Sequence, residues 1–138
     1  MTEIKQVDTQ FLEDVLSGEA VPEHKSMEYN ATKHKFVLAE GENGDGYLTF
    51  GTPTMGLGEI YDFMKRYNNF EIKNKGGGWL EKACQESRQG VIIPERVLFY
   101  GSSDDLGNFD RELLNRTLQG NLRQDFPYEI YGYCLRLK

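Results

Sequence analysis

Long apolar runs are missing from this chain of 138 residues. No stretch approaches the roughly 18 consecutive apolar residues that a membrane-spanning helix needs. The first residues also lack the basic start and purely apolar run of a secretory leader. We therefore expect a protein without a membrane partner, located in the cytoplasm.

Cysteine and histidine are scarce, with two of each: Cys84, Cys134, His24 and His34. A zinc site needs three or four ligands, and these four residues form no ligand-spaced cluster. We expect no metal and no cofactor. In a cytosolic protein two cysteines are usually reduced and buried, and we expect this of both, with a disulfide between them as the alternative. Neither cysteine lies in a nucleophile motif, so we assign no catalytic residue, and an enzyme is the less favoured class.

Charge of both signs is present, but it is unevenly spread. The net charge is −6, made of −8 over residues 1–62 and +2 over residues 63–138. The overall acidity argues against a general nucleic-acid binder, because such proteins gain affinity by neutralising phosphates. Length favours a single globular domain over residues 1–138, and an aromatic content of 12% argues against disorder. A homo-oligomer remains open.

The first half of the chain predicts one helix followed by strands. Apolar residues at helical spacing follow Asp8 and Thr9, either of which can cap a helix that Gly18 ends. Residues 26–51 then predict a three-stranded antiparallel meander, with a turn at residues 41–46. That turn, GENGDG, partly mimics a calcium loop. Both end ligands of an EF-hand are missing, so we interpret it as a hairpin turn.

The second half predicts helices alternating with strands. We expect helices over residues 57–68, 79–90 and 108–119, the last capped by Asn108 and ended by Gly120, with an apolar stripe on one face. We expect strands over residues 68–75, 91–100 and 127–138; the second is buried and interrupted by Pro94, with residues 96–100 as its core part. The prediction is an α+β fold in one domain: an N-terminal helix, the meander, and helices alternating with strands around a mixed, mostly antiparallel sheet.

The sharpest motif is KNKGGGWLEKAC, residues 73–84. Glycines at the start of a helix let backbone N–H groups approach an anion, and basic side chains nearby add attraction. Trp79 could stack on a base. The stretch matches neither common phosphate-binding pattern, so a flexible joint between a strand and a helix is favoured, and a protein-contact loop is the third interpretation. The candidate ligand residues are Lys73, Lys75, Gly76, Gly77, Gly78, Trp79, Lys65 and Arg66.

Two functions remain. The favoured one is a small acidic interaction protein, such as an inhibitor, an immunity protein or an accessory factor, that binds a partner protein. It is supported by the lack of catalytic motifs, the eight tyrosines and the polarised charge. The alternative is a nucleotide- or phosphate-binding domain, with or without enzymatic turnover, that uses Gly76–Gly78 and the neighbouring lysines.

Overall fold

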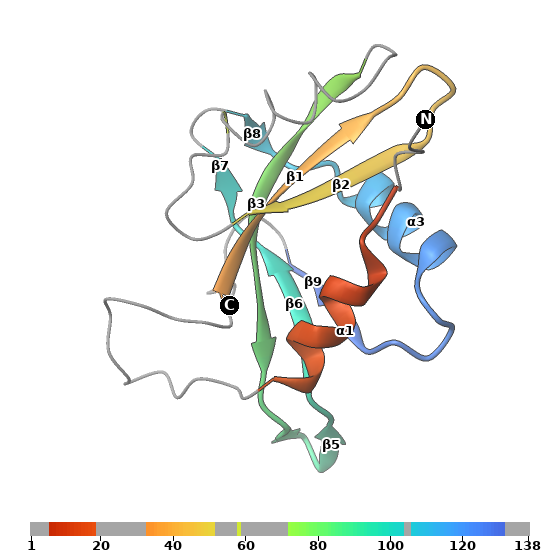
Figure 1. The fold of residues 1–138 in the computed structure, drawn as a ribbon. Coiled ribbons are helices and arrows are strands. Elements are labelled where there is room, and N and C mark those ends of the chain that lie inside the picture. Colours follow the sequence, from red (N-terminus) through yellow and green to blue (C-terminus); the bar gives the residue numbers. More distant parts are fainter. Residues whose placement is uncertain (1–5, 19–32, 52–57, 59–71, 104–105, 132–138) are drawn as a thin grey trace.

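The computed structural model describes residues 6–18, 33–51, 58, 72–103 and 106–131. Within these ranges the chain forms a first helix, then eight strands, a second helix and a last strand (Figure 1). The elements are α1 (Thr9–Ser17), β1 (Lys33–Glu40), β2 (Gly46–Gly51), β3 (Lys73–Ala83), β4 (Glu86–Arg88), β5 (Val91–Ile93), β6 (Arg96–Tyr100), β7 (Ser102–Ser103), β8 (Gly107–Asn108), α3 (Arg111–Asn121) and β9 (Tyr128–Ile130).

The main sheet has five strands in the order β2-β1-β3-β6-β9. Its neighbours are antiparallel except β6 and β9, which run parallel. Two short antiparallel pairs, β4-β5 and β7-β8, complete the described strands. The predicted fold class, α+β with a mixed and mostly antiparallel sheet, is confirmed.

Helix α1 forms where the sequence predicts it. The Asp8 side chain accepts a hydrogen bond from the backbone N–H of Phe11, which satisfies a donor that the first turn leaves unpaired. Gly18 ends the helix, and its N–H donates to the carbonyl of Asp14. The apolar face buries Leu12 and Val15.

Strands β1 and β2 form the predicted hairpin. The Asn43 side chain accepts from the N–H of Asp45, and the N–H of Gly41 donates to the carbonyl of Asp45, which closes the turn. The hairpin-turn interpretation of GENGDG is therefore confirmed. The first strand expected for the meander lies outside the described residues.

Strand β3 contradicts the helix predicted for residues 79–90. The chain is extended from Lys73 to Ala83, and this strand lies in the centre of the sheet between β1 and β6. The helical spacing arose because polar residues occupy inner positions of the strand and break the expected alternation. Lys82 is buried and donates to the carbonyl of Gly18, and Glu81 accepts a hydrogen bond from Tyr100 at 2.5 Å. Buried polar groups are tolerated there because each has a partner.

Helix α3 carries the predicted apolar stripe but is shifted. Its N-cap is Asp110, whose carboxylate accepts from the N–H of Leu113, and not Asn108. Asn108 instead belongs to β8. The helix passes through Gly120 and ends at Asn121, so the predicted stop is also wrong. The stripe is buried as expected, at Phe109, Leu113, Leu114 and Leu118.

One core joins both helices to the inner strands. Leu12 and Val15 of α1 and Leu114 of α3 belong to the same buried cluster as Phe36, Leu80 and Phe99 of the sheet. The rings of Phe36 and Phe99 meet edge to face with centroids 5.6 Å apart, a favourable arrangement for two aromatic side chains. Residues 84–95 contribute nothing to this cluster.

Several expectations fall on residues that the structure does not describe. They are the helix at 57–68, of which only Gly58 is described, and residues 68–71 of the strand at 68–75. Residues 132–138 of the last expected strand also lie outside the described part, which ends with β9 and Tyr131. None of the described helices is long and apolar enough to cross a membrane.

Candidate functional site

The predicted glycine site has a different geometry from the one expected. Gly76, Gly77 and Gly78 are buried inside β3, and no helix begins at Trp79. The glycines are therefore neither a cradle at a helix N-terminus nor a loose joint before a helix. The premise of the anion site is removed, although ligand binding by these residues is untested and stays a prediction.

Close backbone contacts explain two of the three glycines. The register of β3 against β1 shifts at Gly76, which has φ = 94°, a value that side-chain-bearing residues rarely adopt. The Asn74 side chain accepts the N–H of Gly76 at 2.8 Å. A Cβ atom on Gly76 would collide with the backbone of Asn108, and one on Gly78 would collide with the carbonyl of Tyr100. The close approach of other backbone segments and the positive φ of Gly76 thus explain why glycine occupies positions 76 and 78.

The other candidate residues of this motif do not converge on one point. Lys73 is exposed, and the ammonium of Lys75 lies 3.5 Å from a carboxylate oxygen of Glu40. The ammonium of Lys35 lies 5.1 Å from the centre of the Trp79 ring, a cation–π distance, so that ring already has a cationic neighbour. Lys65 and Arg66 lie outside the described residues.

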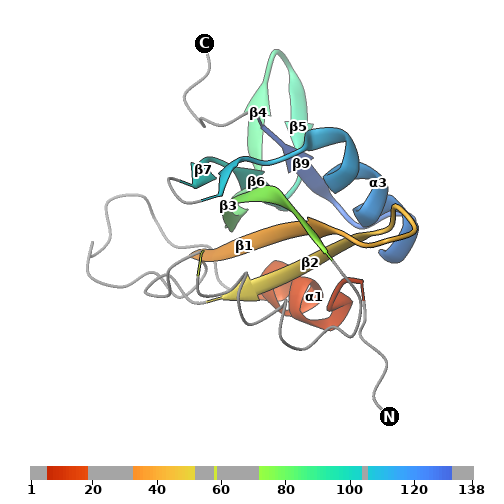
Figure 2. The same ribbon diagram turned by 90° about the horizontal axis from the view of Figure 1, so that it is seen from above.

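A second region differs from the sequence expectations, which placed residues 86–90 in a helix and residues 91–93 in a buried strand. Strands β4 and β5 form a two-stranded hairpin that projects beyond the main sheet (Figures 1 and 2). Its turn consists of Gln89 and Gly90, with φ of 52° and 79°. Positive φ at both positions is typical of a type I′ turn, whose twist matches that of the flanking strands.

The hairpin continues the ladder between β3 and β6 after an interruption. The last pair of the main sheet is Ala83 with Arg96, and the first pair of the hairpin is Glu86 with Ile93. Two residues on each side separate these pairs, among them Pro94, which has no N–H to donate. The backbone carbonyl groups at the interruption therefore need a hydrogen-bond donor from elsewhere in the molecule.

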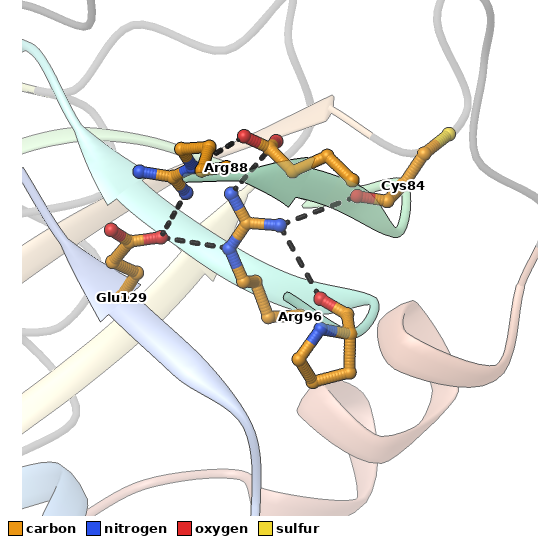
Figure 3. A network of polar contacts seen from close by, with 6 residues as sticks. Cys84, Arg88, Arg96 and Glu129 are labelled. Carbon is orange, nitrogen blue, oxygen red and sulfur yellow. Dashed lines mark hydrogen bonds and ion pairs between the residues drawn. The ribbon is translucent and has the colours of Figure 1, made fainter. Parts of the chain in front are cut away.

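Arg96 supplies that partner (Figure 3). Its Nη1 donates to the carbonyl oxygens of Cys84 and Pro94, at 3.3 Å each. Its Nε donates to Glu129 of β9 at 2.7 Å, and its Nη2 to Glu86 of β4 at 3.2 Å. One buried guanidinium thus contacts the carbonyl groups on both sides of the interruption, strand β4 of the hairpin and the edge strand β9. These contacts fix the hairpin relative to the sheet.

The charges around Arg96 balance. Arg88 contacts Glu86 at 2.5 Å and Glu129 at 3.6 Å, so two arginines meet two carboxylates. The hydrogen bond from Arg96 is the main cause that lowers the pKa of Glu86 below its usual 4.5. Two arginines and two carboxylates give this network no formal net charge.

Cys84 begins the interruption and lies exposed as a free thiol. The expectation that this thiol is shielded is wrong, because Cys84 follows a strand and does not lie on an apolar helical stripe. Cys134 lies outside the described residues. Among the residues that the structure describes, no three His, Cys, Asp or Glu side chains gather closely enough to hold a metal ion.

The tip of the hairpin is apolar and exposed. Val91 is 60% exposed and Ile92 is 66% exposed, and they are the two large hydrophobic side chains left exposed in the described parts of the chain. A hollow of about 490 Å³ lies on the hairpin, lined by Arg88, Gln89, Val91 and Ile93. Covering these two side chains would be favourable, because burial removes apolar area from water.

A larger hollow, of about 740 Å³, lies between α3 and β9. Several of its polar groups already bond to one another. Tyr128 donates to Asn115 at 2.6 Å, Arg111 donates to the carbonyl of Ile130 at 3.2 Å, and Glu129 accepts from Arg96. The first two bonds join α3 to the edge strand β9 and the third joins β6 to β9, so we interpret all three as structural.

No protein-family model matches this sequence, and no curated protein matches it either. The hairpin was not predicted from the sequence because Gln89-Gly90 is not among the common two-residue turn pairs, such as Asn-Gly. The one available signal was the run of three β-branched residues, Val91–Ile93, ahead of Pro94.

Proposed function

We propose that this protein acts by docking to a partner protein through the β4–β5 hairpin. The observation that carries the proposal is the exposure of Val91 and Ile92 on a hairpin that Arg96 holds in place. Leaving apolar area in water is unfavourable, by about 25 cal/mol per Å², and a partner that covers the tip recovers that free energy. Arg96 already orders the hairpin in the free protein, so binding loses less conformational entropy.

This role fits the class favoured by the sequence: an inhibitor, an immunity protein or an accessory factor, acting in the cytoplasm. The alternative of a nucleotide-binding domain gains no support from the fold, because Gly76–Gly78 are buried within a strand. The docking role needs no catalytic group, and the charges beside the hairpin are already paired.

Retention of partners on the immobilised protein tests the proposal. The full chain, the double variant Val91→Ser, Ile92→Ser and a control, Glu42→Ser, are each incubated with lysate of the source organism. Glu42 is exposed in the turn between β1 and β2, at the far end of the molecule from the hairpin (Figure 1). Circular dichroism and thermal unfolding establish that all three are folded.

We expect at least one protein to be retained by the wild type and by the control, and lost with the double variant. The purified partner should then bind the wild type and the control with the same dissociation constant. Retention of the same proteins by all three would show that the hairpin is not the docking element, and the proposal would be rejected.

A further inference from the structure

We infer that the hairpin enters a cleft of its partner, with apolar walls that contact both faces of the hairpin. This inference rests on the proposed function and adds the shape and the chemistry of the surface that would receive it. It follows from the directions of the exposed side chains, the charges beside them and the backbone groups at the hairpin edges.

Val91 and Ile92 point to opposite faces of the hairpin. They are consecutive residues of β5, and successive side chains of a strand alternate between its faces. The register supports this, since Val91 is opposite Arg88 while Ile92 is opposite Ser87. A flat partner surface could cover one of the two apolar side chains and would leave the other in water.

The small size of the tip also favours enclosure. A stable protein interface buries about 800 Å² on each partner, which two side chains on a three-residue strand do not provide. A second copy of this chain that paired along β5 would meet the same limit, because each copy would offer only that short strand. A cleft can cover the turn, both faces and both strands of the hairpin together.

The charges at the hairpin argue for a neutral, apolar lining. Arg88 and Arg96 are paired with Glu86 and Glu129, so no unbalanced charge attracts a phosphate backbone or an anionic lipid surface. On the face of Val91, the hollow of about 490 Å³ next to Ile93 can accept an apolar side chain from one wall of the cleft.

The edges of the hairpin set a further requirement. In a two-residue hairpin the residues beside the turn, here Arg88 and Val91, exchange hydrogen bonds, so the next pair directs its N–H and C=O groups outward. Those residues are Ser87 and Ile92. Burying such groups without a partner is unfavourable, so the cleft must offer polar atoms along its rim. A layer packed on a sheet lies about 10 Å from it, and the cleft packs on both faces of the hairpin. The two walls of the cleft therefore stand roughly 20 Å apart.

Photocrosslinking from the two faces tests this inference. A photoreactive phenylalanine derivative replaces Val91 in one full-length variant and Ile92 in a second, with Glu42 as the control position. Each is irradiated with the source lysate, and crosslinked peptides are identified by mass spectrometry. The affinity of the identified protein is then measured for Val91→Ser and Ile92→Ser separately.

We expect both hairpin positions to crosslink to one protein, at two separate segments of it, and the control position not to. Each serine variant should bind about tenfold or more weakly, the loss that corresponds to leaving one such side chain uncovered. Crosslinking and weakening at only one position would overturn the cleft while leaving docking by the hairpin intact. Crosslinking between copies of this chain would make the occupant a second copy and would also overturn it.

A null result at both positions would reject the cleft and the proposed function together. To separate that outcome from insertion into lipid, cosedimentation with vesicles of phosphatidylcholine alone and with added phosphatidylserine is compared for the wild type and the double variant. Binding to vesicles that the double variant loses would identify a membrane surface as the occupant and would exclude the protein cleft.

Discussion

Replacement of Arg96 by alanine is the most informative perturbation of this fold. The substitution removes the guanidinium that donates to Glu129, Glu86 and the carbonyl oxygens of Cys84 and Pro94. The Arg96 side chain is only 6% exposed, but its acidic partners are 43% and 33% exposed. Water can therefore solvate the carboxylates that the substitution leaves unpaired.

The expected loss follows from these exposures. Removing one partner of a fully buried ion pair costs about 3–5 kcal/mol, and partial access of water lowers that value. We expect Arg96→Ala to reduce the free energy of unfolding by about 2–4 kcal/mol. The comparison variant is Arg88→Ala, whose side chain is 42% exposed and which should cost under about 1 kcal/mol, as exposed ion pairs do.

Urea denaturation followed by circular dichroism measures both variants, and hydrogen exchange reports the hairpin directly. Arg96→Ala should accelerate exchange of the backbone amides of β4 and β5 more than those of β1. Arg96→Lys should restore only part of the stability, because an ammonium cannot reproduce the planar fork of the guanidinium. If Arg96→Ala costs no more than Arg88→Ala, the bridging role is wrong.

Three further outcomes are expected. Gly78→Ala should destabilise the fold by more than about 1 kcal/mol in denaturant unfolding, because its Cβ would meet a backbone carbonyl. Gly120→Ala lies in a helix with open space around it and should stabilise the fold by about 0.5–1 kcal/mol, so equal effects would refute the packing argument. Cys84 should react with a thiol reagent at once without denaturant, as located by peptide mapping, and protection until unfolding would contradict its exposure. The lowered pKa of Glu86 means that its contribution to stability is present above pH 4.5 and is lost as the pH falls below that value. The protection of the hairpin amides, corrected for the intrinsic pH dependence of exchange, should therefore fall there. Glu86→Gln should lose that pH response, and a response unchanged by the substitution would rule out this carboxylate as its source.

The sequence predicted those parts of the fold in which local pattern and burial agree. In α1, the cap at Asp8, the stop at Gly18 and the buried face at Leu12 and Val15 all indicate the same helix. The stripe of α3 was equally clear, and only its boundaries shifted, since Asp110 and Asn108 can both cap a helix. Consistency of this kind across several signals is what makes an element predictable.

The sequence failed where tertiary contacts determine the residue. Gly76 and Gly78 read as flexible because the backbones that approach them, from Asn108 and Tyr100, are distant in sequence. Lys82 and Glu81 lie in the segment wrongly predicted as a helix, because their partners, Gly18 and Tyr100, come from other elements and give no local signal. The hairpin site was missed for the same reason, since Arg96 and Glu129 are 33 residues apart.

The interruption between the main sheet and the β4–β5 hairpin makes the tip a replaceable module. Residues 84–95 contribute no side chain to the core cluster, which resumes at Val97. Polar contacts connect them to the rest of the molecule: Arg96 and Glu129, outside the tip, contact Glu86 and Arg88, and Lys82 of β3 pairs with Glu95. The turn and β5 could therefore diversify in evolution, or be exchanged by grafting, with little effect on the stability of the sheet; under the proposed docking role, varying the few residues from Gln89 to Ile93 would change the partner.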